Sequence, residues 1–325
     1  MILLGAAGFV ALVLQSGPAQ LARDASALGA GAVLVVAVAA FEHLLHALAW
    51  GRCFAGGQRP PVRALLETHL AAHAINLSTP TATLGGEVVR GGIAWEGISP
   101  SERLTALTVD RLSLAAADTA IGLGGCAALW FSGALDGALR TAVAAGGLAL
   151  AAGVAGFLAL QRRGRLASVV GEGRLPRRLL GPARAARLAA GAREIDGRLA
   201  AFHAERAGDF LASVALHALG TSVGALQLAI FLAWLGVPFS FGGLLAMFAA
   251  ATALDLFSFF VPARLGAQEG ARMVAFSLGG LEPARGLLFS LVLRLEQLVW
   301  AALGMALYAR VASSVPSAPE GRPAC

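Results

Sequence analysis

Long apolar stretches separated by short polar segments make up most of this chain. Six of them approach or exceed the length of about 20 residues that crosses a bilayer as a helix; they cover 1–17, 28–50, 104–132, 139–160, 208–235 and 284–310. Two further apolar segments, 62–96 and 241–281, contain Pro, Gly and charged residues near their middles. The pattern predicts an all-α polytopic membrane protein with about six full spans plus two re-entrant helical hairpins.

The composition excludes an ordinary soluble domain. The chain is 57% hydrophobic and 14% charged, and its mean hydropathy is +0.73. Soluble domains carry about 25% charged residues, because their surfaces need that polar cover. The first apolar stretch lacks the basic start and the small-residue cleavage site of a signal peptide, so we expect it to be a retained span. Residues 1–325 are therefore expected to form a single integral membrane domain.

Positive charge is concentrated between Arg162 and Arg206. This segment carries 11 Arg and four acidic residues, a net charge of +7, whereas the whole chain carries +6. A basic segment between spans is typical of a cytoplasmic loop, so we predict a basic cytoplasmic linker over 161–207 and no nucleic-acid partner. From Pro182 onward the pattern predicts an interfacial helix on anionic lipid, whose apolar face is formed by Leu188, Ile195, Leu199 and Phe202.

The distribution of Arg also predicts the orientation of the spans. The loop 51–63 carries three Arg, and the end of the chain carries Arg310 and Arg322, so both are expected in the cytoplasm, as is the N-terminus. With 161–207 also cytoplasmic, each broken segment has to start and end on one side of the membrane. The segment 62–96 would enter from the cytoplasm, and 241–281 from the outer side. Residues 311–325 are expected to form a short flexible tail.

The two broken segments are copies of one sequence pattern. Asn76–Arg90 reads N-L-S-T-P-T-A-T-L-G-G-E-V-V-R, and Ser258–Arg272 reads S-F-F-V-P-A-R-L-G-A-Q-E-G-A-R. The offset between matching residues stays at 182 to 184, up to an Arg within the span that follows each copy. We predict two inverted repeats, 28–132 and 208–310, the arrangement of secondary transporters whose site lies between the repeats. The expected hairpin turns are at Pro80, Gly85, Gly86, Pro262 and Gly266.

Each copy places a Glu and an Arg three residues apart on a helix, where they can pair. A helix start beside Arg also forms an anion site. An ionised residue at the bilayer centre costs about 2.5–3.5 kcal/mol unless it pairs or lines a polar cavity. Two compatible interpretations stay open: pairs that lock the hairpins, and a cavity that binds a lipid headgroup. The predicted substrate-binding residues are Glu87, Arg90, Arg111, Gln268, Glu269, Arg272 and Arg294, with a secondary polar lining of Asp110, Asp118, His69, His73, Asp255 and Glu296.

The spacing of His69 and His73 also fits a metal-ligating helix face. The zincin motif, however, needs Glu directly after the first His, and this chain has Leu70 there. The three Cys residues are scattered, without a C-x-x-C pair, which argues against a disulfide framework or a thiolate metal site. We expect the His side chains to be hydrogen-bonded or to line a cavity, and we expect no metal and no other cofactor.

Several of these motifs resemble a known family. L-G-G-E-V-V-R at 84–90, G-I-S-P at 97–100 and D-R at 110–111, with V-P-A-R-L-G-A-Q-E-G-A at 261–271 and L-R-L-E-Q-L-V-W at 293–300, resemble the lysylphosphatidylglycerol synthase transmembrane (flippase-like) family. The resemblance covers about residues 28–310 and implies lipid handling at the bacterial inner membrane, without the aminoacyl-transferase domain of the full synthases. Within the family these blocks are most similar to hopanoid-biosynthesis-associated membrane proteins. The Thr79-Pro80-Thr81 turn departs from the more apolar turn of many members, which leaves the lipid open.

These features give one leading function and two alternatives. The leading function is a multi-pass inner-membrane lipid translocator or lipid-headgroup-binding protein. Its partner would be a membrane lipid with an anionic or isoprenoid-type headgroup, and lipid-biosynthesis enzymes would be further partners. The alternatives are a membrane-embedded lipid-modifying enzyme and a non-transporting scaffold for lipid-synthesis enzymes. The chain shows no nucleophile elbow, complete metal motif or nucleotide fingerprint, so we expect no catalytic residues.

Overall fold

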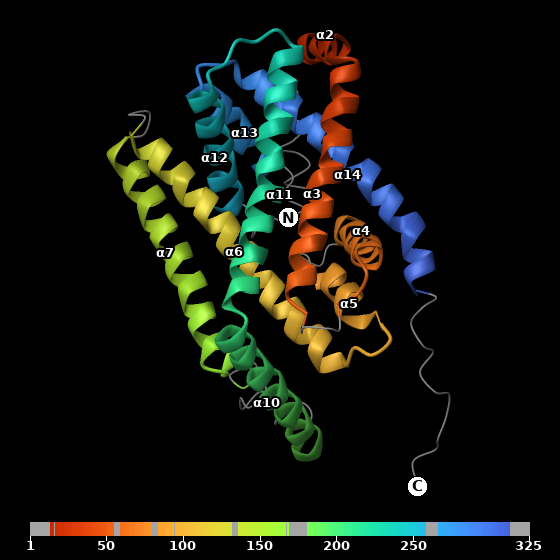
Figure 1. The fold of residues 1–325 in the computed structure, drawn as a ribbon. Coiled ribbons are helices and arrows are strands. Elements are labelled where there is room, and N and C mark those ends of the chain that lie inside the picture. The colour runs from red at the N-terminus through yellow and green to blue at the C-terminus, as the bar shows by residue number, and fades with distance from the viewer. Residues whose placement is uncertain are drawn as a thin grey trace.

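The structure, a computed structural model, describes residues 14–15, 17–54, 59–79, 84–93, 95–131, 136–166, 168, 181–257 and 266–312. Over these residues the protein is all-helical, with eleven helices and no strand (Figure 1). The helices are α2 (Pro18–Leu28), α3 (Ala30–Arg52), α4 (Val62–Ser78), α5 (Leu84–Gly92), α6 (Pro100–Phe131), α7 (Gly137–Arg162), α10 (Pro182–Glu205), α11 (Ala207–Trp234), α12 (Phe241–Phe257), α13 (Ala267–Leu278) and α14 (Pro283–Ala312).

Five of these helices are long and apolar enough to cross a membrane. They cover Ala30–Arg52, Pro100–Phe131, Arg140–Arg162, Ala207–Trp234 and Pro283–Arg310, and each begins and ends within four residues of a predicted span. The predicted first span, 1–17, lies almost entirely outside the described residues. The lengths and composition of the five helices make this a multi-pass membrane protein.

Each of the two broken segments consists of two helices. The first is α4 followed by α5, and the second is α12 followed by α13. Pro80 and Pro262, the predicted turn residues, lie outside the described residues. Gly266 begins α13 with a positive φ of 80°, a conformation that glycine adopts without strain. This glycine therefore provides the positive φ at the point where the chain enters α13.

The prediction that Gly85 and Gly86 form a turn is wrong, because both lie in the first turn of α5. Gly86 instead allows α5 to approach α4 closely. Its N–H donates a 2.6 Å hydrogen bond to the side-chain oxygen of Asn76, and a Cβ at this position would lie 2.6 Å from the carbonyl oxygen of Ala72. The glycine is needed for packing between the two helices of the broken segment.

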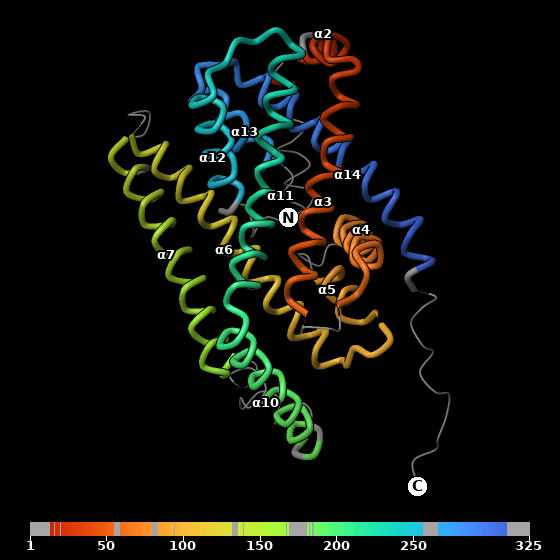
Figure 2. The backbone as a smooth tube through the Cα atoms, in the orientation of Figure 1, coloured from red at the N-terminus to blue at the C-terminus, as the bar shows by residue number. Residues whose placement is uncertain are grey.

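Each of the two predicted repeats packs one helix of its broken segment against a long helix of the other repeat (Figures 1 and 2). We call α3–α6 the first half and α11–α14 the second half. α3 and α11 lie side by side and run in opposite directions. α4 of the first half packs along α14 of the second, and α12 of the second half packs along α6 of the first. These three helix pairs make the most extensive contacts among the described residues, so the two halves share one core.

Two glycines lie at equivalent positions in the contacts between the two halves. Gly125 on α6 lies so close to α12 that a Cβ would clash with the carbonyl oxygen of Ala249. Gly304 on α14 lies equally close to the carbonyl oxygen of Leu70 on α4. Subtracting 125 from 304 and 70 from 249 gives 179 residues both times. The same close backbone approach is therefore built twice, as small residues allow between membrane helices.

The basic linker contributes α10, which lies at one end of the bundle beyond α6 and α7 (Figure 2). Leu199 and Phe202 are buried in a cluster with core residues of α3, α4 and α6. The apolar face of α10 therefore packs largely on protein, whereas we had expected it to lie on lipid. On the same helix, His203 contacts the side-chain oxygen of Gln161 at 2.8 Å, and burial lowers the pKa of this imidazole, with Arg162 acting in the same direction.

Candidate functional site

A cavity of about 710 Å³ lies between the two halves. Helices α3, α4 and α6 line it from the first half, and α11, α12, α13 and α14 from the second, together with Leu150 of α7. Polar groups in the lining come from both halves. The ionisable residues of the lining are Glu42, His46, His73, Asp118, Asp255, Arg272 and Glu296.

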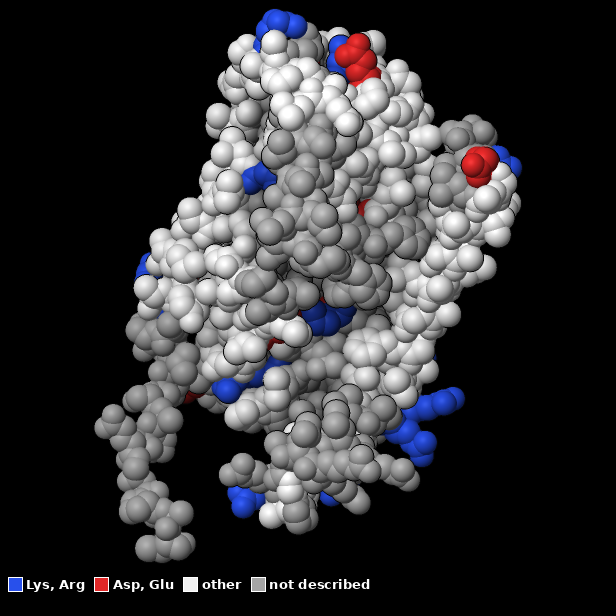
Figure 3. Space-filling view, turned by 180° about the vertical axis from the view of Figure 1, so that it is seen from behind, with Lys and Arg blue, Asp and Glu red and all other residues white. Residues whose placement is uncertain are grey.

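The surface around this region is consistent with a membrane setting. Figure 3 shows that charged side chains on the rear face lie mainly towards the ends of the molecule, while basic groups also occupy a hollow near the middle. Polar groups at membrane depth are tolerated where they are buried in protein or line a wet cavity. The charged cavity therefore accounts for acidic residues in otherwise apolar spans.

Arg272 is the guanidinium that lines the cavity. It comes from α13, and its Nη2 donates to the Asp255 carboxylate of α12 at 3.2 Å. Glu296 of α14 and Asp118 of α6 also line the cavity, and Asp118 accepts a 2.8 Å hydrogen bond from the hydroxyl of Thr221. The lining thus holds four carboxylic acids and one guanidinium, so it can bind a phosphate at one point and cationic or hydroxyl groups at others.

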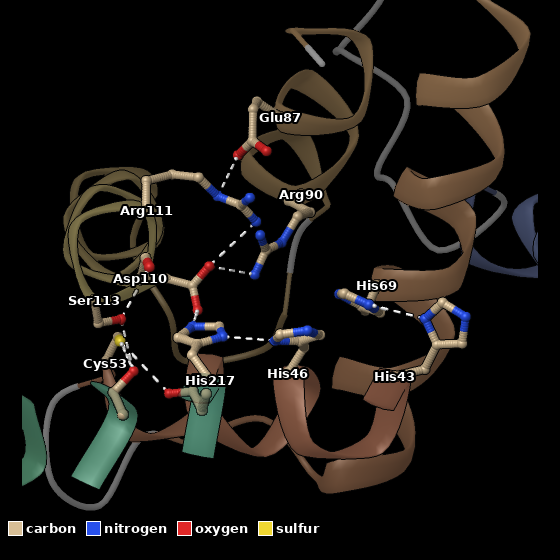
Figure 4. Close-up of polar contacts among 12 residues, drawn as sticks. His43, His46, Cys53, His69, Glu87, Arg90, Asp110, Arg111, Ser113 and His217 are labelled. Atoms are coloured by element: carbon tan, nitrogen blue, oxygen red, sulfur yellow. Dashed lines mark hydrogen bonds and ion pairs between the residues drawn. The ribbon is translucent and has the colours of Figure 1, made fainter. Parts of the chain in front are cut away.

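The corresponding Arg90 of the first half is placed differently. It is 2% exposed, and its Nη2 donates to Asp110 at 2.8 Å. Its guanidinium carbon lies 4.1 Å from the ring centroid of Trp50, a cation–π arrangement. Arg111 binds the same carboxylate at 3.2 Å and reaches Glu87 at 3.3 Å (Figure 4). This group joins α5 to α6 and does not belong to the cavity lining.

In the second half, Glu269 is the more deeply buried of the two residues Glu269 and Arg272. One of its carboxylate oxygens accepts from Arg294 of α14 at 2.9 Å. The other accepts from the backbone N–H of Gly266 at 2.8 Å, where the start of α13 offers unpaired N–H groups and a favourable dipole. Glu269 therefore fastens the beginning of α13 to α14.

The predicted pairing within each copy, Glu87 with Arg90 and Glu269 with Arg272, is wrong. In both copies the Glu binds an Arg of the following span, and the Arg binds an Asp on another helix. A pair within one helix would leave the carboxylates of Asp110 and Asp255 facing fewer cations, and a buried carboxylate without a partner is costly. Pairing between helices compensates more of the buried charges.

The cavity contains only part of the predicted site. Arg272, Asp118, His73, Asp255 and Glu296 line it, as predicted. The remaining predicted residues are used in contacts between helices or are buried beside them, and so are absent from this lining; they are Glu87, Arg90, Asp110, Arg111, His69, Gln268, Glu269 and Arg294.

Sequence reasoning missed a cluster of histidines next to the cavity. Nδ1 of His43 lies 3.3 Å from Nε2 of His69, and Nδ1 of His46 lies 2.7 Å from Nδ1 of His217. Nε2 of His217 lies 3.0 Å from Asp110. Figure 4 shows these side chains in one layer between α3, α4, α6 and α11. The sequence signal was the run of Glu42, His43 and His46 in an apolar span, but its partners come from three other helices.

The fold and the site together define a multi-pass helical membrane protein with a charged cavity between two exchanged halves. Residues 2–304 match the family model described as "Lysylphosphatidylglycerol synthase TM region", and the chain belongs to this family. The expected family is therefore confirmed, and with it a link to lipid metabolism. Comparison with curated proteins gave no match, and comparison with solved structures gave none.

Proposed function

We propose that this protein is a flippase-like translocator of the bacterial inner membrane. In this proposal it carries a lipid headgroup between leaflets through the cavity, while the acyl chains stay in the bilayer. The lipid is moved without any change in its covalent bonds, so the protein is not an enzyme. The observation that carries the proposal is the cavity of about 710 Å³, to which both halves contribute charged side chains.

The composition of the lining changes the expected headgroup chemistry. Of the four Arg residues predicted to hold an anionic headgroup, Arg272 lines the cavity, and the other three bind Glu or Asp outside it. A phosphate would bind at Arg272, because guanidinium and phosphate form charge-assisted hydrogen bonds. Glu42, Asp118 and Glu296 would then hold an amine or hydroxyl groups beyond that phosphate. In our proposal the cargo is therefore a phosphate-bearing lipid, either a phospholipid or an isoprenoid phosphate.

The reciprocal packing of the halves supports a rocking mechanism. Alternating access in transporters with inverted repeats moves one bundle against another around a fixed central site. Here α4 with α14, and α12 with α6, form the contacts between halves, and the cavity lies between these pairs. In our proposal the halves insert from opposite sides, with both termini in the cytoplasm. The resemblance to hopanoid-biosynthesis-associated proteins makes lipid-biosynthesis enzymes candidate partners.

The proposal is tested by filling the cavity. Ala251 lines it on α12, so Ala251→Trp should reduce the space for a headgroup. Leu148→Trp is the matched control, because Leu148 on α7 is exposed and a larger apolar group there would face lipid. Purified variants are reconstituted with a fluorescent phospholipid, and its accessibility to a membrane-impermeant quencher reports transfer between leaflets. We expect transfer by wild type and Leu148→Trp, with at least tenfold slower transfer by Ala251→Trp. Equal transfer rates for the three proteins would contradict the proposal. A wild-type rate no faster than that of protein-free vesicles would contradict it as well.

A further inference from the structure

A continuous line of polar side chains leads from the cavity to the buried Arg90–Asp110 pair. It begins at Glu42 and His46, which both line the cavity and lie 3.8 Å apart. His46 contacts His217 at 2.7 Å through their Nδ1 atoms, and Nε2 of His217 lies 3.0 Å from Asp110 (Figure 4). Beyond Asp110, Arg111 and Glu87 are partly exposed on the other side of the line. A line of polar groups therefore runs from the cavity towards a second region of the surface, and its members from Glu42 to Asp110 can each gain or lose a proton.

The hydrogen bonds determine which nitrogen atoms carry protons. An ionised carboxylate only accepts hydrogen bonds, so Nε2 of His217 donates its N–H to Asp110. In neutral His217 the other nitrogen, Nδ1, must then accept, and the proton in the short contact belongs to Nδ1 of His46. Nε2 of neutral His46 is consequently a free acceptor that faces Glu42. Both imidazoles are oriented for a proton that enters from the cavity.

We propose that Glu42, His46, His217 and Asp110 form a proton path that couples lipid movement to a pH gradient. This inference rests on the proposed translocator function. A proton leaves the Glu42 carboxyl group and binds Nε2 of His46, while the Nδ1 proton of His46 passes to Nδ1 of His217. The Nε2 proton of His217 then passes to Asp110. Each imidazole gains and loses one proton, Glu42 becomes a carboxylate, and Asp110 becomes a neutral acid. One water or a small rotation of Glu42 closes the 3.8 Å step.

Arrival of the proton has a structural consequence. A neutral Asp110 no longer balances Arg90 of α5 and Arg111 of α6, both of which bind its carboxylate. Arg90 would then remain buried against Trp50 without an anionic partner, which is unfavourable. The contact between α5 and α6 weakens, so that α5 can move relative to α6. The proton thus changes the stability of one conformation, as coupling between two sites requires.

Other titratable and charged groups surround the path. Glu296 of α14 and Asp118 of α6 act on Glu42, and His43 of α3, His69 of α4 and Arg90 of α5 lie around His46.

The experiment measures how much lipid accumulates in one leaflet. The protein is reconstituted into vesicles of phosphatidylethanolamine and phosphatidylglycerol that contain fluorescent phosphatidylethanolamine, with the membrane potential clamped. A gradient of about one pH unit is a tenfold ratio of proton concentrations, so coupling to one proton allows up to about tenfold accumulation. We expect wild type to reach several-fold asymmetry that reverses with the gradient. We expect His217→Gln to give equal leaflets under either gradient while it still transfers lipid.

His203→Gln is the matched control, because His203 lies on α10 outside the path and its variant should accumulate lipid as wild type does. Equal leaflets with wild type, together with rapid transfer, would overturn the proton path and leave the translocator proposal standing. Accumulation by His217→Gln equal to that of wild type would also overturn the path. Absence of transfer under every gradient would refute the translocator function, and the coupling with it.

Discussion

The same Glu-x-x-Arg sequence occurs on α5 and on α13, but the two copies bury opposite members. On α5, Arg90 has a side chain that is 2% exposed, while that of Glu87 is 19% exposed. On α13, the side chain of Glu269 is fully buried, while that of Arg272 is 13% exposed in the cavity lining. A repeated motif therefore does not imply a repeated role.

The difference gives each half a separate task. In the first half, Arg90 and Asp110 form a buried pair that connects to the histidines. In the second half, Glu269 fastens α13 at its beginning, and this leaves Arg272 at the cavity. The fold is close to symmetric at its backbone contacts, while the chemistry of its two broken segments is not.

The largest effect should come from breaking the buried pair of the first half. Asp110→Asn or Arg90→Gln alone should lower the free energy of unfolding by about 3–5 kcal/mol, because each leaves a buried charge without its partner. The double variant should recover a substantial part of this loss. Thermal unfolding in detergent measures all three. Strictly additive losses in the double variant would show that the two side chains are not coupled.

A smaller effect should distinguish the two glutamates. Glu269→Gln loses charge-assisted hydrogen bonds to Arg294 and to the Gly266 N–H, and should cost about 1.5–3 kcal/mol. Glu87→Gln, at the more exposed position, should cost less than about 1 kcal/mol. Unfolding of the two variants under the same conditions makes the comparison. Equal losses would mean that the two copies are used alike, against our account.

Substitution of Gly125 and of Gly304 should affect stability alike, although substitutions in the ion pairs of the two halves should not. Gly125→Ala and Gly304→Ala each place a Cβ against a backbone carbonyl, and each should cost about 1–3 kcal/mol by overpacking. Gly124→Ala is the matched control, since a Cβ there meets nothing within 4 Å, and it should be neutral or slightly stabilising. A loss for only one of the two exchanged glycines would break the equivalence of the two contacts.

Orientation can be tested with the smallest disturbance to the fold. Glu96, between α5 and α6, and Ser240, directly before α12, are both exposed. In a background without Cys53, Cys126 and Cys325, Glu96→Cys should change stability by less than about 0.5 kcal/mol, and Ser240→Cys, which weakens the cap hydrogen bond from the Gly243 N–H at the start of α12, should cost about 0.5–2 kcal/mol. We expect an impermeant thiol reagent to reach Ser240→Cys from outside the cell and Glu96→Cys only from the cytoplasm. Labelling of both from the same side would refute inverted halves.

The sequence predicted much of the fold because spans are long and apolar. Their ends came within a few residues of the helices, and the Glu and Arg landmarks correctly located α5 and α13. The partners of those charges could not be predicted, since Asp110 and Asp255 reach them from other helices. For the same reason the role of His217 could not be predicted. It is a single histidine in an apolar span, and its partner His46 lies on another helix.

The most direct test of the account is lipid transfer by Arg272→Gln. Arg272 is the guanidinium of the cavity lining, and its side chain, 13% exposed, is ion-paired with Asp255, so its loss should cost about 1–3 kcal/mol in stability. The exposed Arg187 of α10 provides the control Arg187→Gln. In vesicles with a fluorescent phospholipid, we expect Arg272→Gln to transfer lipid at least tenfold more slowly than wild type, and Arg187→Gln to match wild type. A folded Arg272→Gln protein that transfers lipid at the wild-type rate would contradict the central claim.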